Sequence, residues 1–247
     1  SATHHNAAEI TDTGTTGIDE IRFSALVPST LTLYSGDSGI ERVILTGTAA
    51  LNINATAVSN ALTILGNAAT NVLMGTSFID SLNGGNGSDI YLINSASEHS
   101  QAEINDNGTS GVDEIRFATT SSGTLTLYAG DIGIERVVIG TGTNSTADTS
   151  GTAAANIDAN LAAKGLNIVG NAGSNSLKGS AFNDVILGGL GTDSLLGHEG
   201  SDIYIIENPT DHTAAEINDS GNASIDELRF AAATAGTLTL FSGDIGI

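Results

Sequence analysis

The chain has 247 residues, 28 acidic against 7 basic, and a formal net charge of −21. Such a surface repels nucleic acid and anionic membranes, which excludes both as expected partners and makes cations the natural counterparts. Cys is absent and only 4% of the residues are aromatic, so we expect no disulfide or thiolate site, a thin aliphatic core, and any metal to be held by oxygen.

Three copies of one pattern organise the chain. The segment AEITDTGTTGIDEIRF (8–23) returns as AEINDNGTSGVDEIRF (102–117) and AEINDSGNASIDELRF (215–230). The copies span 1–94, 95–207 and 208–247, and we expect one continuous solenoid rather than three separate domains. The sequence lacks an initiator Met and stops within the third copy. We therefore expect the chain to be a segment of a longer protein.

Each copy begins with a histidine and a degenerate nine-residue unit. His5, His99 and His212 are equivalent, and a polar loop role is favoured over metal ligation because no second imidazole lies at ligand spacing. The unit GTTGIDEIR (14–22) has Gly at its first and fourth places and an aspartate at its sixth. This aspartate and its equivalents either hold calcium or make turn hydrogen bonds, and the sequence leaves both readings open: Asp19, Asp113 and Asp226.

Short aliphatic runs follow and predict β-strands. They are separated by Gly, Asn, Ser and Thr, and in the first copy they are TLTLY (30–34), ERVIL (41–45), LNI (51–53) and LTIL (62–65). Five of the seven basic residues stand at two repeat positions close behind acidic residues: Arg22, Arg116 and Arg229, then Arg42 and Arg136. We predict that these arginines pair with carboxylates on neighbouring coils.

Two blocks of regular nine-residue units, or nonads, occupy 66–92 and 170–205. Each nonad opens with Gly, has Asn or Asp at its sixth place and a large apolar residue at its eighth. The units are GNAATNVLM, GTSFIDSLN and GGNGSDIYL, then GNAGSNSLK, GSAFNDVIL, GGLGTDSLL and GHEGSDIYI. This pattern is typical of calcium-binding parallel β-helices. Six residues make a turn and three make a strand whose apolar side chain points into the core, so successive units alternate between two sides of a flattened solenoid.

The nonads predict calcium sites between units eighteen residues apart along one edge. The expected pairs are Asn71 with Asp89, Asn175 with Asp193, and Asp184 with Asp202, whereas Asp80 has no partner at that spacing. Because Asp184 and Asp202 form the only pair with two carboxylates, we expect their site to fill first. Carbonyls of the turn glycines complete the ligand sets: Gly84, Gly85, Gly87, Gly179, Gly188, Gly189, Gly191, Gly197 and Gly200.

The nonads resemble the haemolysin-type calcium-binding repeats of the RTX (repeats-in-toxin) family. The intervening IDEIRF, TLTLY and GIERVV segments look like the filler coils of very large RTX-type surface proteins. The resemblance implies an all-β, right-handed parallel β-helix or β-roll, calcium-driven folding after export, and secretion by a type I apparatus. Asn71 and Asn175 depart from the family pattern, where Asp is usual.

Two functional classes remain open. The favoured hypothesis is a calcium-rigidified structural segment of a large secreted or cell-surface bacterial protein, an adhesin or surface-layer component, with adjoining repeats as partners. The alternative is the calcium-binding tail of a secreted enzyme or toxin whose catalytic domain lies elsewhere. We predict no enzymatic role for this segment. Gly36–Gly39 (GDSG) superficially resembles a serine-protease motif, but the positions equivalent to Ser38 are Ile132 and Ile245, and no supporting His and Asp accompany it.

Overall fold

The computed structural model describes residues 5–6, 9–14, 16–101, 103–214, 216–221 and 225–247. The chain divides into two compact units, residues 1–115 with 130–134, and residues 116–129 with 135–247. The division falls within two strands, β9 (Asp113–Phe117) and β11 (Ile134–Ile139).

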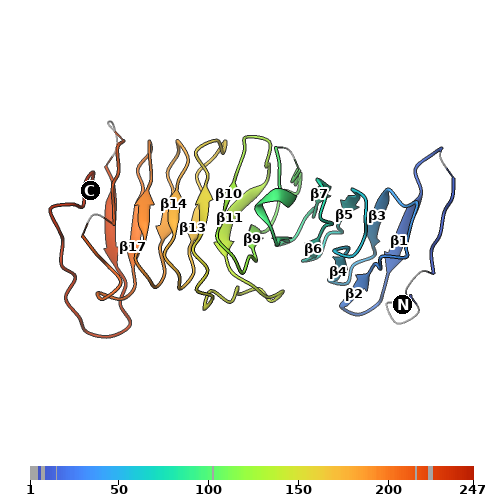
Figure 1. Ribbon diagram of the computed structural model, residues 1–247, viewed down its shortest axis with the longest axis horizontal. Coiled ribbons are helices and arrows are strands. Elements are labelled where there is room, and N and C mark those ends of the chain that lie inside the picture. The colour runs from blue at the N-terminus through green and yellow to red at the C-terminus, as the bar shows by residue number, and fades with distance from the viewer. Residues whose placement is uncertain (1–4, 7–8, 15, 102, 215, 222–224) are drawn as a thin grey trace. The chain divides into compact units, whose positions relative to one another are not determined.

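Unit 1 is built from two groups of parallel strands (Figure 1). One group has the order β1 (Glu20–Ser24), β3 (Arg42–Thr46), β5 (Thr63–Leu65), β7 (Ser81–Asn83). The other has the order β2 (Ser29–Thr32), β4 (Leu51–Asn54), β6 (Val72–Met74), β8 (Ile90–Ile93). Successive strands along the chain therefore alternate between the two groups, and each pair of strands makes one coil. A short 3-10 turn, η2 (Ala96–Glu98), follows β8.

Unit 2 repeats this arrangement. One sheet has the order β10 (Gly123–Thr126), β12 (Ala155–Asp158), β14 (Ser176–Lys178), β16 (Ser194–Leu196). Opposite it, β11 is followed by β13 (Asn167–Val169), β15 (Val185–Leu187), β17 (Ile203–Ile206) and β18 (Glu227–Phe230). The fold is an all-β parallel solenoid, as the sequence predicts.

Strand register within the nonad blocks is eighteen residues, or two nonads. Val72 pairs with Ile90 and Ser81 with Thr63 in unit 1, and Ser194 pairs with Ser176 in unit 2. This spacing confirms the alternation expected from the repeat. The same spacing brings the turns of nonads i and i+2 to the same edge of the solenoid. In every nonad the turn immediately precedes the strand, so turns stack whenever their strands pair.

Within each unit, the eighth-place side chains of the nonads form a buried apolar core. All seven have exposed fractions of 0 or 1%: Leu73, Leu82, Tyr91, Leu177, Ile186, Leu195 and Tyr204. They stack in register, for example Leu73 on Tyr91 and Leu177 on Leu195. Because one such residue per nonad fills the interior, two short strands and two turns suffice for a coil. No helix in the described part of the chain is long and apolar enough to cross a membrane.

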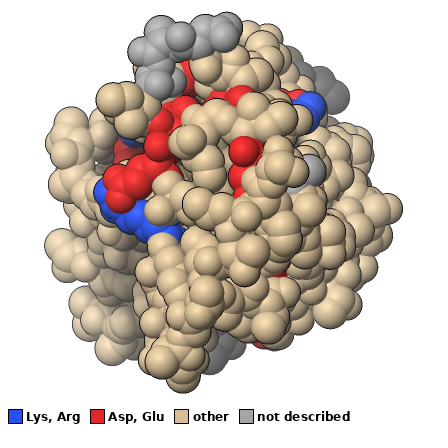
Figure 2. Space-filling view, turned by 90° about the vertical axis from the view of Figure 1, so that its left-hand side faces the viewer, with Lys and Arg blue, Asp and Glu red and all other residues tan. Residues whose placement is uncertain are grey.

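Arginine pairing follows the prediction only in part. Arg42 Nη1 donates to Glu20 on the neighbouring coil at 3.3 Å, as expected. The prediction is wrong for Arg22 and Arg229, whose Nε atoms bond to Glu20 and Glu227 on their own strands. Residues two apart on a strand share a face, so these ion pairs form within one strand. Figure 2 shows acidic side chains gathered on part of the C-terminal face of unit 2, with Lys and Arg side chains beside some of them.

Candidate metal centres

The seven nonads form two kinds of turn, which differ in the partner of the sixth-place side chain. In four of them the backbone N–H of the second residue donates to that side chain, and we call these capped turns: 66–71, 75–80, 170–175 and 179–184. The bonds from Thr76 N to Asp80 Oδ2 and from Ser180 N to Asp184 Oδ2 are 2.6 and 2.7 Å long. The structure describes every residue of the capped turns, and none has a positive φ.

Side chains at the second place reinforce the capped turns. The hydroxyls of Thr76 and Ser180 donate to Asp80 and Asp184. Asp184 Oδ1 also accepts from Leu166 N at 2.6 Å. Both carboxylate oxygens of Asp184 are therefore engaged within the protein.

The other three nonads have what we call open turns, 84–89, 188–193 and 197–202. Their second and fourth residues have positive φ: Gly85 and Gly87, Gly189 and Gly191, His198 and Gly200. One carboxylate oxygen of each sixth-place aspartate accepts from the backbone N–H eighteen residues earlier: Asp89 from Asn71, Asp193 from Asn175, and Asp202 from Asp184. Among the described residues, the second oxygen, Oδ2, of Asp89, Asp193 and Asp202 is buried and accepts no hydrogen bond.

First-place glycines allow the open-turn carboxylates to lie against the backbone. A Cβ added at Gly84, Gly188 or Gly197 would collide with the Oδ2 atom of Asp89, Asp193 or Asp202. Nine glycines are predicted from the sequence to contribute carbonyls to calcium sites. Eight of these nine lie in open turns. The ninth, Gly179, lies in a capped turn.

The residues of each predicted eighteen-residue pair are adjacent. The contact is a hydrogen bond from the backbone N–H of the first residue to the carboxylate of the second. Asn71 and Asn175 use their amides structurally, since each Nδ2 donates to a carbonyl twenty residues earlier, Leu51 O and Ala155 O, at 2.7 Å. Asp80 accepts from Leu62 N eighteen residues earlier, which supplies a backbone partner where the sequence offers no side-chain partner. Ligation by Asn71, Asn175, Asp80 and Asp184 stays a prediction, and the hydrogen bonds favour Asp89, Asp193 and Asp202 instead.

Burial makes these carboxylates costly to ionise. Burial, together with the charge of neighbouring aspartates, raises the pKa of Asp89 to about 8 and that of Asp202 to about 7. Burial likewise raises the pKa of Asp193 and of Asp184 to about 6. A buried carboxylate oxygen without a donor costs free energy that a bound cation would relieve.

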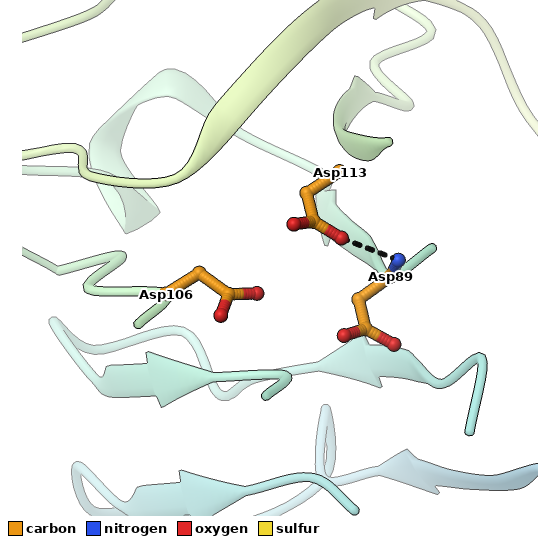
Figure 3. Close-up of side chains that lie close together, drawn as sticks. All are labelled: Asp89, Asp106 and Asp113. Carbon is orange, nitrogen blue, oxygen red and sulfur yellow. Dashed lines mark hydrogen bonds between the residues drawn. The ribbon is translucent and has the colours of Figure 1, made fainter. Parts of the chain in front are cut away.

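The degenerate nonads contribute to two clusters of three aspartates. Asp113 approaches Asp89 and Asp106, and Asp226 approaches Asp202 and Asp219; in each cluster one oxygen per residue lies within 4.8 Å of the others. Figure 3 shows the first cluster, with Asp113 accepting from Asp89 N at 2.7 Å. Asp19 lies beside Asp12, whose hydrogen bond raises the pKa of Asp19. Sequence reasoning passed over Asp106 and Asp219, although the signal was present in an aspartate shared by all three AEI(T/N)D segments.

The repeat histidines each lie between two carboxylates. His99 Nδ1 lies 3.0 Å from Glu103 Oε2 and its Nε2 lies 3.1 Å from Asp131 Oδ2, and His212 repeats both distances with Glu216 and Asp244. These histidines lie in loops, as expected, but His99 and His212 are buried. Since both ring nitrogens face carboxylates, they tie two loop segments together.

Comparison with known proteins agrees with the geometry. Residues 65–92 and 169–204 match the family model of the RTX calcium-binding nonapeptide repeat, in four copies. No curated protein and no solved structure matches the chain significantly. The fold and the turns define a calcium-binding repeat protein with a parallel β-solenoid. Its two nonad blocks are RTX calcium-binding nonapeptide repeats.

The residues present fit calcium. The ion prefers six to eight oxygen ligands, and the open turns offer carboxylate oxygens beside glycine-rich backbone. Asp89, Asp193 and Asp202 would hold it through their Oδ2 atoms. The bound ion would supply charge neutralisation and a cross-link between coils.

Proposed function

We propose that this chain is a calcium-rigidified structural segment of a large secreted or cell-surface bacterial protein of the adhesin or surface-layer type. The observation that carries the proposal is the set of buried, unpartnered Oδ2 atoms in the three open turns, within the described residues. Without an ion, each leaves a desolvated carboxylate in the folded chain, so calcium binds the folded state far better than the unfolded one.

Repetition of the filler coils favours a structural role over an enzyme tail. The three copies keep the same AEI(T/N)D and IDE(I/L)RF or VDEIRF segments between nonad blocks, whereas a tail needs only one block. Ser38 supports a non-catalytic reading, because it makes the same β-bridge with Thr11 that Ile132 makes with Asn105. A catalytic domain encoded elsewhere in the gene would favour the alternative of a secreted enzyme or toxin.

Adjoining repeats are the partners we propose at the C-terminal strand. In the second copy Arg116 and Phe117 are buried, with exposed fractions of 0 and 1%. Their equivalents on β18 are Arg229, with a 52% exposed side chain, and Phe230, which is 37% exposed. A further coil of the same kind would bury both.

Calcium concentration would then decide where the chain folds. For sites with dissociation constants near 10⁻⁴ M, of the order found in extracellular modules, millimolar calcium contributes about 1.4 kcal/mol per site. Submicromolar cytosolic calcium contributes almost nothing, which leaves the chain unfolded until export.

Circular dichroism of the chain tests this proposal. We expect a β-sheet spectrum in millimolar calcium and loss of much of it after chelation. The matched control is the same chelator with calcium restored in excess, which should recover the spectrum. An unchanged spectrum after chelation would contradict calcium-dependent folding of this segment.

A further inference from the structure

We propose that Asp89, Asp106 and Asp113, and likewise Asp202, Asp219 and Asp226, form a calcium site that fastens each nonad block to the coil that follows it. One ligand of each site comes from the last nonad of a block, and the other two come from the following AEIND and degenerate-nonad segments. Those two lie outside the residues that match the RTX repeat model. The inference deepens the proposed function and rests on it for the identity of the ion.

The spacing of the carboxylates suits a calcium ion without rearrangement. Calcium–oxygen distances of about 2.3–2.6 Å put ligands on opposite sides of the ion about 5 Å apart. In both clusters the three ligand oxygens lie within 4.8 Å of one another. A single ion can therefore contact one oxygen of each residue.

An independent observation points to a ligand. Asp89 and Asp202 have exposed fractions of 0%, and within the described residues their Oδ2 atoms accept no hydrogen bond. Each remaining oxygen, Oδ1, is held by a backbone N–H, from Asn71 and from Asp184. In Figure 3 the carboxylate of Asp106 lies beside that of Asp89 and points toward the space below Asp113. The cluster thus has a fully buried oxygen that a cation would satisfy.

A tyrosine orients the second ligand in each site. Gly84 N donates to Tyr91 Oη at 2.7 Å, and Tyr91 Oη donates to Asp106 Oδ2 at 2.5 Å. The same chain runs from Gly197 N through Tyr204 to Asp219, with distances of 2.7 and 2.9 Å. Hydrogen bonds of this kind fix a ligating carboxylate and are part of most metal sites.

The position of these tyrosines in the repeat supports a dedicated site. Leu or Ile fills the eighth place of the other five nonads, and Tyr stands there only in the last nonad of each block. A buried tyrosine hydroxyl needs a hydrogen-bond partner. Asp106 and Asp219 are the partners of Tyr91 and Tyr204. The two sites are therefore a repeated feature of block ends.

Calorimetric calcium titration of the full chain tests the proposal. The D106N/D219N variant should bind two fewer calcium ions than the unchanged chain, because Asn removes the charge and keeps the size. D193N, which changes an open turn inside a block, should bind one fewer and retain both block-end sites. Equal stoichiometry and affinity for D106N/D219N and the unchanged chain would overturn the inference and leave the proposed function standing. Absence of any calcium binding to the unchanged chain would overturn both.

Terbium luminescence supplies a local readout. The chain has no Trp and four Tyr, so Tb³⁺ emission excited in the tyrosine absorption band is sensitised by tyrosine. We expect emission that calcium displaces, that D193N keeps and that D106N/D219N loses. Emission retained in D106N/D219N would contradict the site.

A milder variant covers the case in which D106N/D219N does not fold. Y91F/Y204F keeps all six carboxylates and the packing of the ring but removes the hydrogen bond to Asp106 and Asp219. We expect two of the calcium ions to bind about tenfold more weakly, as for other partners of metal ligands. Calorimetric curves identical to those of the unchanged chain would overturn the inference.

Discussion

The second residue of each nonad decides whether the sixth-place side chain is hydrogen-bonded by its own turn. In capped turns its backbone N–H donates to that side chain, and in two of them the hydroxyl of Thr76 or Ser180 adds a second donor. In open turns a positive φ at Gly85, Gly189 or His198 accompanies a carboxylate oxygen that accepts no hydrogen bond from the described residues. Two nonads with identical aspartates can thus differ in calcium affinity.

Neighbouring nonads allow a direct test of this difference. Asp193→Asn should remove one calcium site, because it neutralises a carboxylate whose Oδ2 atom has no donor among the residues that the structure describes. Asp184→Asn should leave the tightest affinity within about threefold, because both oxygens of Asp184 already accept hydrogen bonds and Asp184 belongs to neither of the aspartate clusters found in the described chain. Calorimetry measures both, and each variant is the control for the other. Loss of the tightest ion in D184N alone would show that the number of carboxylates outranks turn geometry, as the sequence predicts.

His99 gives a pH dependence of stability. Burial alone would lower its pKa, but hydrogen bonds to Asp131 and Glu103 outweigh this and raise it from 6.5 to about 9. Burial also raises the pKa of Glu103, and we place the shared proton on the imidazole because two carboxylates face it. The stabilisation is fully present below pH 6.5 and is lost as pH rises through about 9.

The variant His99→Gln isolates this contribution. We expect it to lower the free energy of unfolding by about 2 to 3 kcal/mol near pH 6, and by progressively less as pH approaches 9. Denaturant unfolding of both proteins at several pH values, in excess calcium, measures the difference. A difference that does not vary between pH 6 and 9 would mean that His99 contributes by packing and not by charge.

At the scale of the element, the turn 197–202 carries identifiable strain. His198 has a φ of 76° and is the one described non-glycine residue with a positive value. Its equivalents in the other open turns are Gly85 and Gly189. A left-handed conformation costs a non-glycine residue about 1 to 2 kcal/mol.

The variant His198→Gly should therefore stabilise the folded chain. We expect a gain of about 0.5 to 1 kcal/mol, since the added flexibility of glycine in the unfolded chain offsets part of the relieved strain. Thermal unfolding in calcium measures it, with Ala181→Gly in the adjacent capped turn as a control expected to destabilise. A lower midpoint for His198→Gly would show that the imidazole has a packing role that exceeds the strain.

Strands and their pairing could be predicted because they depend on residue spacing. The runs expected at 41–45 and 51–53 are β3 and β4 to within one residue, and the eighteen-residue register follows from two nonads per coil. The two turn types were not predictable from the nonad pattern, because GSAFND and GHEGSD both depart from the glycine consensus and yet have opposite φ signs at the second residue. The place of Asp106 was not predictable because it comes from a loop that returns to the block end, and no periodicity fixes such a loop.

At the scale of the whole molecule, two electrostatic effects of calcium must be separated. The net charge of −21 opposes compaction generally, and any salt screens it. The buried carboxylates at the open turns and block ends repel one another over short distances, where salt has little effect, since the screening length is about 8 Å at physiological ionic strength. If calcium acts at these carboxylate sites, we expect that sodium chloride cannot replace calcium in folding the chain.

Titrations of the calcium-free chain with CaCl₂, MgCl₂ and NaCl at matched ionic strength distinguish these effects. We expect CaCl₂ to produce the full β-sheet circular dichroism signal. NaCl should produce only a small part of it, because sodium lowers surface repulsion without neutralising buried oxygens. MgCl₂ should resemble NaCl, since magnesium gives up its water reluctantly and demands octahedral geometry at about 2.1 Å. Recovery of the full signal in NaCl would mean that surface charge, and not the carboxylate sites, controls the folding of this chain.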